Sequence, residues 1–345
     1  MQYRTLGDTG VRVSSLALGA MNFGPIGDTT QEEASAIVDA ALEAGVTLVD
    51  TADFYGAGVS EEMVGRALAG RRDDVVLATK AGLPFGEDPL HRGASRRWLT
   101  RALEASLRRL GTDHVDLFQV HRWDPLTSDE ETLAALTDLQ RAGKVRYVGT
   151  SKYPAYRMVE AQWTARERHL TRFVTEQPNY SLLGRGVEAD VLPVAERYRL
   201  GVLCFSPLAG GWLTGAIREG REVSTRRSGV AWLADRFDLS LPVNRAKLAA
   251  VEQLAAVADQ AGLTLIELAL GFVTAHRGVT SALIGPRTLE HLRSQLAAAD
   301  TVLTPDVLDA VDAVVPPGTE IAPAEANFTP PSLADAALRR RGAGA

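Results

Sequence analysis

The stretch EAGVTLVDT, residues 43–51, passes from a glycine directly into a short apolar run that ends in a carboxylate. The same passage from a glycine into a short apolar run returns in RLGTDHVDLFQVH (109–121), RAGKVRYVGTS (141–151) and YRLGVLCFSP (198–207). Glycine readily adopts the left-handed conformation that ends a helix, so each stretch predicts a helix, its C-terminal cap and a strand. The chain is therefore a repeat of helix and strand.

Apolar residues at helical spacing precede these glycines, as at Leu103, Leu107 and Leu110. The sequences TQEE from Thr30 and SDEE from Ser128 match the capping box that begins a helix.

Extending the pattern along the chain predicts eight strands that alternate with helices, and hence an α/β protein with a closed (β/α)8 TIM barrel. The strands are expected near Leu16–Leu18, Thr47–Asp50, Val75–Thr79, Val115–Gln119, Tyr147–Thr150, Phe173–Glu176, Val202–Phe205 and Ala282–Ile284. A doubly wound open sheet is the competing architecture.

Segments outside the repeat predict additions to the barrel. The N-terminal YRTLGDTGVRV predicts a β-hairpin that turns at Asp8–Gly10 and plugs the barrel floor, and helical patterns continue beyond the eighth strand to about residue 315. We expect one domain over 1–345, with the barrel at about 14–300 and an extension at about 301–345. The polar residues 211–240 fit either a lid over the mouth or a disordered surface excursion, and the final LRRRGAGA is expected to be mobile.

The composition excludes several classes of protein. With 345 residues, 46% of them hydrophobic, the chain has enough apolar surface for a large core, and its net charge of −6 lacks the basic excess of a nucleic-acid binder. Cys204 is the only cysteine, so no internal disulfide can form. The sequence has neither a signal segment nor an apolar run of about 18 residues, and we expect a soluble cytoplasmic protein with no membrane partner.

Titratable residues follow three consecutive predicted strands. Asp50 ends the second strand with Tyr55 on the following loop, Lys80 ends the third, and His121 ends the fourth. Each alone has an ordinary explanation, such as a turn residue, a surface lysine or a satisfied core histidine. Because catalytic groups of such barrels sit at the C-terminal strand ends, we expect the four to meet in one cavity.

These four residue types suit the reduction of a carbonyl group. Hydride transfer leaves negative charge on the carbonyl oxygen, which a positioned acid must protonate. An ammonium at Lys80 favours the phenolate of Tyr55, so we expect it to lower the tyrosine pKa, and Asp50 is expected to pair with Lys80. His121 would donate a hydrogen bond to the carbonyl oxygen and orient it.

The blocks VDTADFYG, LATK and DLFQVH resemble signature sequences of the aldo-keto reductases, which are barrel enzymes that use NADPH. The resemblance implies that Asp50, Tyr55, Lys80 and His121 form the catalytic tetrad. It also implies reduction of aldehydes or ketones to alcohols, with Tyr55 as general acid and a small carbonyl compound as the substrate.

A cofactor site is expected without a Rossmann fingerprint, because YGAGVSEE has Glu61 where the third glycine should stand. Barrels commonly bind phosphate after strands seven and eight, where FSPLAGGWLTG and LIGPRTLEHLRSQL stand. Arg287 is assigned to the 2′-phosphate of NADPH because a guanidinium suits a phosphate monoester. The resemblance implies that Ser151, Gln177, Phe205, Ser206, Leu208 and Gly210 contact NADPH. With Asp50, Gly285, Arg287 and Gln295, they make ten expected contacts.

The match departs from the family at three of these blocks. Asparagine often stands where this chain has Lys152, tyrosine or tryptophan where it has Phe205, and asparagine where it has Gln295. Lys152 is left without a role.

Candidates for the substrate wall are Met21, Phe23, Phe54 and Trp123, although ordinary loop packing explains each of them equally well. Two other functions stay open: an NADPH-binding regulatory or redox-sensing protein with little turnover, and a barrel aldolase that uses Lys80 as a Schiff base. No metal site is predicted, and the sequence gives no oligomeric state.

Overall fold

The computed structural model describes residues 1–218 and 235–340 and contains the expected barrel. Eight parallel strands close on themselves in the order β10-β3-β4-β5-β6-β7-β8-β9, so the open-sheet alternative is wrong. The strands are β3 (Leu16–Gly19), β4 (Leu48–Asp50), β5 (Val76–Ala81), β6 (Val115–Val120), β7 (Val145–Ser151), β8 (Thr175–Gln177), β9 (Gly201–Cys204) and β10 (Ser281–Ile284). They differ from the predicted strands by up to two residues at their ends, and β5 runs past Lys80.

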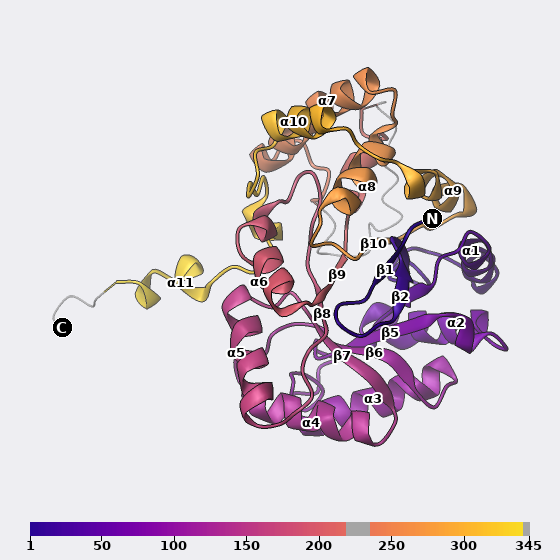
Figure 1. Cartoon of the computed structure of the whole chain (residues 1–345), viewed down its shortest axis with the longest axis vertical. Coiled ribbons are helices and arrows are strands. Elements are labelled where there is room, and N and C mark those ends of the chain that lie inside the picture. The colour runs from indigo at the N-terminus through magenta and orange to yellow at the C-terminus, as the bar shows by residue number, and fades with distance from the viewer. Residues whose placement is uncertain (219–234, 341–345) are drawn as a thin grey trace.

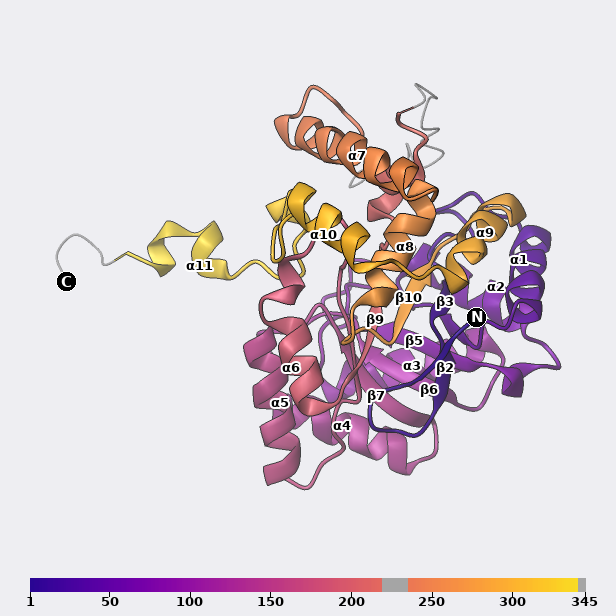
Figure 2. The ribbon, with the colours of Figure 1, turned by 45° about the horizontal axis from the view of Figure 1, so that its top comes forward.

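Helices cover the outside of the barrel (Figures 1 and 2). They are α1 (Gln31–Glu43), α2 (Val59–Ala67), α3 (Arg96–Leu110), α4 (Asp129–Arg141), α5 (Ala155–Glu167), α6 (Val191–Tyr198), α7 (Pro242–Gln260), α8 (Leu265–Ala275), α9 (Leu289–Leu296) and α10 (Pro305–Val314). Their apolar faces join the outward side chains of the strands in the larger hydrophobic core. The short α11 (Pro331–Ala334) lies apart from the barrel.

The N-terminal hairpin closes the barrel floor, as predicted. Strands β1 (Tyr3–Thr5) and β2 (Arg12–Ser14) pair antiparallel and cross in front of the barrel in Figure 1. Leu6 and Val13 of the hairpin are fully buried against the lowest inward side chains of the barrel strands, among them Leu48 and Leu117. The hairpin therefore seals the end of the barrel opposite the C-terminal strand ends.

The barrel interior has an apolar lower layer and a polar upper layer. Because side chains alternate along a strand, the residue two positions after each lower-layer residue also points inward. Leu48, Ala78 and Leu117 of the lower layer are thus followed by Asp50, Lys80 and Gln119. All three of these polar residues are buried, which places a compact polar cluster at the mouth of the barrel.

The predicted caps are mostly confirmed. Gly45, Gly111 and Gly143 have positive φ values of 88°, 65° and 75° where α1, α3 and α4 end. The fourth glycine was assigned wrongly, because Arg199 takes the left-handed conformation and Gly201 begins β9. A Cβ on Gly201 would lie 2.8 Å from the backbone N of Gly7, so this glycine permits the close approach of the hairpin.

The two predicted capping boxes have different outcomes. Thr30 and Glu33 form both reciprocal hydrogen bonds. Ser128 accepts from the Glu131 N–H, but the Glu131 carboxylate instead accepts from the backbone N–H of Arg96. The second box is therefore half formed, and its carboxylate connects α4 to the start of α3.

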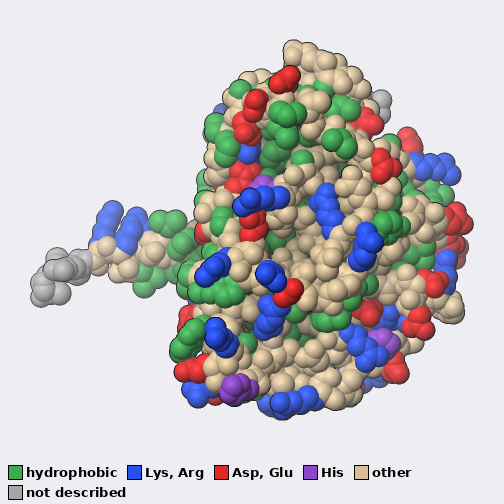
Figure 3. Space-filling model, viewed as in Figure 1, with side chains coloured by type: hydrophobic (Ala, Val, Ile, Leu, Met, Phe, Trp, Pro, Cys, Tyr) green, Lys and Arg blue, Asp and Glu red, His purple; other side chains and the backbone are tan. Residues whose placement is uncertain are grey.

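The C-terminal extension lies partly on the barrel and partly away from it. α9 and α10 pack on the body, whereas the segment around α11 stands off it and exposes hydrophobic side chains such as Leu333 and Leu338 (Figures 1 and 3). Residues 219–234 of the predicted insertion and residues 341–345 of the tail lie outside the described residues, and so do the lid and mobility expectations made for them. Within the described part of the chain, no single helix is long and apolar enough to cross a membrane, and only α7 and α8 together, bent by 92°, meet that test.

Candidate active site

Lys80 joins two of the other predicted residues at the barrel mouth. Its Nζ forms an ion pair with Asp50 Oδ1 and donates hydrogen bonds to the carbonyl oxygen of Thr51 at 2.8 Å and the hydroxyl of Tyr55 at 3.3 Å. Its side chain has no exposed surface. A charge buried this deeply needs such partners, and here they fix the ammonium beside the phenol.

Two strand glutamines hold the other oxygen of Asp50. Gln119 and Gln177 each donate from Nε2 to Asp50 Oδ2, at 3.1 and 3.0 Å. Gln119 was not among the predicted residues, although its position two before His121 on the same strand face could have revealed it. Ser151, on β7, donates through its Oγ to the carbonyl oxygen of Gln177 at 2.9 Å. Asp50 is thus held from three other strands.

His121 completes the group beside Tyr55. The two rings meet edge to face with centroids 5.8 Å apart. Burial, followed by the positive charges of Lys80, Arg122 and Lys152, lowers the pKa of His121 well below its ordinary value. The imidazole is therefore neutral near pH 7 and can donate one N–H to an oxygen.

Lys80 lowers the pKa of Tyr55, as predicted, but other effects decide the net direction of the shift. Burial raises the pKa of Tyr55 and outweighs the opposing effect of Lys80, while the Asp50 carboxylate raises it further. Burial alone would lower the pKa of Lys80, but the adjacent Asp50 and Tyr55 reverse this and raise it. At neutral pH the pair is therefore an ammonium next to a protonated phenol, which is the form that can donate a proton.

A second cluster of buried charged residues includes Asp53, which lies on the same loop as Tyr55. Asp53 is 1% exposed, and neither of its carboxylate oxygens has a hydrogen-bond partner among the described residues. Glu61 is fully buried and forms an ion pair with Arg109 at 2.7 Å. Burial, and then the charge of Glu61, raise the pKa of Asp53 to about 8. Sequence reasoning missed this cluster because its partners come from separate helices.

The loop after β9 contains a run of left-handed backbone conformations. Ser206, Ala209, Gly210 and Gly211 all have positive φ values. A Cβ on Gly210 would overlap the guanidinium of Arg236, which donates to the Gly210 carbonyl oxygen at 3.1 Å. Backbone N–H groups in such conformations commonly surround phosphate. The expected Phe205, Ser206 and Leu208 are half-buried along the start of this loop.

The residues expected after β10 also fit a nucleotide. The carbonyl oxygen of Gly285 accepts from Asn22 at 2.6 Å, which fixes the strand end. Arg287 is half-buried, and burial, followed by the charge of Arg287, lowers the pKa of His291. Gln295, on α9, is buried, and its Oε1 has no hydrogen-bond partner among the described residues. A buried acceptor of this kind suits an amino group such as that of adenine.

The four expected substrate residues are placed differently from one another. Phe54 is 39% exposed next to Tyr55, Met21 is half-buried, and Trp123 lies in an aromatic group with Tyr156 and Phe328. Phe23 is fully buried in the hydrophobic core, so we leave it out of the candidate site. Phe328 had no signal in the sequence, because its contact spans more than 200 residues.

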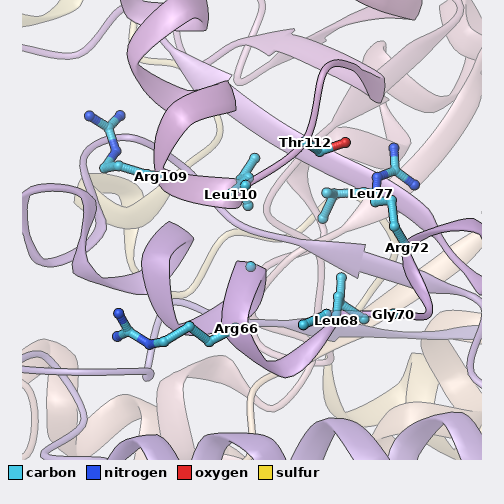
Figure 4. A pocket seen from close by; sticks show the side chains of 11 residues that line it. Arg66, Leu68, Gly70, Arg72, Leu77, Arg109, Leu110 and Thr112 are labelled. Atoms are coloured by element: carbon cyan, nitrogen blue, oxygen red, sulfur yellow. The ribbon is translucent and has the colours of Figure 1, made fainter.

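A cavity of about 290 Å³ lies elsewhere, between α2 and α3 (Figure 4). Its arginines already have acidic partners: Arg66 pairs with Glu62, Arg72 with Asp116 and Arg109 with Glu61. It contains none of the residues at the strand ends. We therefore place the functional site at the barrel mouth and not in this cavity.

Comparison with known proteins identifies the family of the chain. The model of the aldo/keto reductase family matches residues 15–316. The uncharacterized oxidoreductase YrpG of Bacillus subtilis is 39% identical over 333 residues, covering 93% of this chain and 98% of that protein.

Two further relatives are named for different functions. A probable voltage-gated potassium channel subunit beta of Oryza sativa is 36% identical over 322 residues, covering 91% of this chain and 97% of its own. The L-glyceraldehyde 3-phosphate reductase of Escherichia coli is 34% identical over 314 residues, covering 88% of each chain. This chain belongs to the aldo/keto reductase family and is an oxidoreductase of that family.

Proposed function

We propose that this protein uses NADPH to reduce an aldehyde or ketone to the alcohol, with Tyr55 as the proton donor. The observation that carries the proposal is the contact of the buried Lys80 ammonium with both Asp50 and Tyr55. A small-molecule carbonyl compound is the expected partner.

Tyr55, Lys80 and His121 would have separate roles in the reduction of the carbonyl group. NADPH, when bound, supplies the hydride that the carbonyl carbon accepts as the C=O double bond becomes single. The hydroxyl of Tyr55 gives its proton to the oxygen, and its own oxygen keeps the electron pair of the broken O–H bond. Lys80 stabilises the resulting phenolate until solvent returns a proton. Neutral His121 donates a hydrogen bond that orients the carbonyl oxygen.

We assign the cofactor to the strand ends around this group. Asp50, Ser151, Gln177 and Phe205 would hold the nicotinamide end. The loop containing Ser206, Leu208 and Gly210 would receive the pyrophosphate, and Gly285, Arg287 and Gln295 the adenosine end with its 2′-phosphate.

Two alternatives receive different support. A Schiff-base aldolase needs an unprotonated lysine, but Asp50 and Tyr55 raise the pKa of Lys80 and its Nζ has three oxygen partners. An NADPH-binding regulatory subunit is favoured by the relatives named as potassium channel subunits. Turnover separates this alternative from the proposal.

The test is a fluorescence titration with NADPH and with NADH, followed by addition of 4-nitrobenzaldehyde while the nicotinamide absorbance is recorded. The proposal expects NADPH binding and loss of that absorbance. Binding without oxidation across a panel of aldehydes and ketones would favour the regulatory alternative. Absence of binding would contradict both.

A further inference from the structure

Two basic residues stand together on the rim of the barrel mouth, next to the candidate catalytic group. The register of β6 with β7 pairs Val120 with Thr150. His121 and Arg122 follow the first of these residues, and Ser151 and Lys152 follow the second. Arg122 and Lys152 therefore leave neighbouring strand ends at the same height.

In the part of the chain that the structure describes, neither cation pairs with a carboxylate. Among the described residues, the guanidinium of Arg122 and the Nζ of Lys152 form no hydrogen bond or ion pair. The carboxylates that act on Lys152 from a distance are Glu320 and Glu325, and Glu325 already pairs with Lys247. Burial, and next the charge of Arg122, lower the pKa of Lys152. Two like charges are thus held near each other, and the carboxylates of Glu320 and Glu325 act on Lys152 only from a distance.

The backbone of Lys152 is strained in the same place. Its φ is +54°, a left-handed value that a lysine rarely adopts, and its N–H donates to the carbonyl oxygen of Gln177 at 3.2 Å. Strain of this kind concentrates at functional sites, where it directs a side chain. Lys152 is half-buried whereas Arg122 is exposed, so a ligand could reach both from the mouth.

We propose that Arg122 and Lys152 bind an anionic group, a carboxylate or a phosphate monoester, on the carbonyl substrate while its C=O group lies at Tyr55 and His121. This inference rests on the proposed function. Around the barrel, β6 is four strands away from β10, so this anion site lies across the mouth from the residues assigned to the cofactor 2′-phosphate. The aromatic group of Trp123, Tyr156 and Phe328 lies beside it and could pack against the body of the substrate.

Matched substrate pairs test the site. The ratio of kcat/KM is measured for 4-carboxybenzaldehyde against its methyl ester, and for glyceraldehyde 3-phosphate against glyceraldehyde. Wild-type protein is expected to prefer the anionic member of at least one pair. The pair that shows the preference identifies the bound group as a carboxylate or a phosphate. Lys152→Met and Arg122→Gln should each reduce that preference about tenfold, as for loss of one charge-assisted hydrogen bond. Arg97→Gln, which removes a charge from exposed α3, should leave it unchanged.

Other outcomes overturn the proposal without touching the proposed function. The site would be contradicted if the wild-type protein reduced the compounds without preferring the anionic member. It would also be contradicted if each variant lost kcat/KM equally for both members of a pair. If wild-type protein reduced none of the four compounds, a second measurement would decide. The melting temperature in inorganic phosphate, against sodium chloride of equal ionic strength, should rise more for wild type and Arg97→Gln than for the two site variants. An equal rise in all four proteins would contradict the site.

Discussion

The Nζ of Lys80 lies 3.3 Å from the hydroxyl of Tyr55, and the same ammonium is paired with the carboxylate of Asp50. Three side chains from β4, β5 and the loop after β4 thus form one chain of contacts, in which Asp50 and Lys80 are buried and Tyr55 is half-buried. Removing any member changes the electrostatic surroundings of the other two.

Lys80→Met is expected to destabilise the protein as well as inactivate it. The variant leaves the Asp50 carboxylate buried with Gln119 and Gln177 as its remaining side-chain donors, and breaking a buried ion pair costs about 3–5 kcal/mol. Urea unfolding measures the loss. The double variant Asp50→Asn with Lys80→Met should regain part of it, and a double variant that is less stable by the sum of both losses would contradict the pairing.

Asp53 makes stability depend on pH. Its pKa is raised to about 8 from an ordinary 3.8, so between these values the folded protein holds a proton that the unfolded chain has released. Stability should therefore fall as pH rises from 4 to 8, by at most roughly 1.4 kcal/mol per pH unit from this group.

The matched variant for this effect is Asp53→Asn. Its urea midpoint should fall less steeply between pH 5 and pH 9 than that of the wild type. Part of the fall should remain, because burial also raises the pKa of Glu176 to about 8. Asp309→Asn on the exposed face of α10 serves as the control. An unchanged slope in Asp53→Asn would contradict a protonated Asp53.

Arg287→Ala tests the assignment of the 2′-phosphate. Loss of a charge-assisted hydrogen bond should weaken NADPH binding by roughly tenfold to a hundredfold and leave NADH binding nearly unchanged. Fluorescence titration with both nucleotides measures the difference, and Arg293→Ala on the exposed side of α9 is the control. Equal losses for NADPH and NADH would count against the assignment.

Gly149 is required inside the barrel by close packing. A Cβ at this position would overlap the Oγ1 of Thr175 and lie 3.3 Å from the Cγ of Gln119. Gly149→Ala should therefore cost about 1–3 kcal/mol, the usual range for overpacking a core. The added change Thr175→Ala should recover part of this loss, as read from urea midpoints. A double variant no more stable than Gly149→Ala would refute the clash.

The sequence predicted the barrel and the four-residue group because both depend on local patterns. A glycine cap and an apolar run recur in the helix–strand units of the chain. Each of the four residues stands at the end of such a run or on the loop that follows it. Arg199, and not Gly201, has the left-handed conformation that ends the helix. Gly201 instead permits the close approach of Gly7, a contact that a local sequence pattern cannot reveal.

Other features depend on distant parts of the chain. Phe328 reaches Trp123 only through the C-terminal extension. The pKa of Tyr55 rises because burial outweighs the neighbouring charge, and burial is set by the whole fold. Phe23 looked like a loop residue near the mouth, but neighbouring elements cover it completely.

The measurement that tests the central proposal most directly is single-turnover reduction of 4-nitrobenzaldehyde by wild type and Tyr55→Phe, each first saturated with NADPH as judged by fluorescence. We expect similar NADPH affinity and a rate at least a hundredfold lower in the variant, because the hydroxyl acts on the substrate oxygen. A Tyr55→Phe protein that binds NADPH and reduces the aldehyde at a near wild-type rate would contradict that proposal.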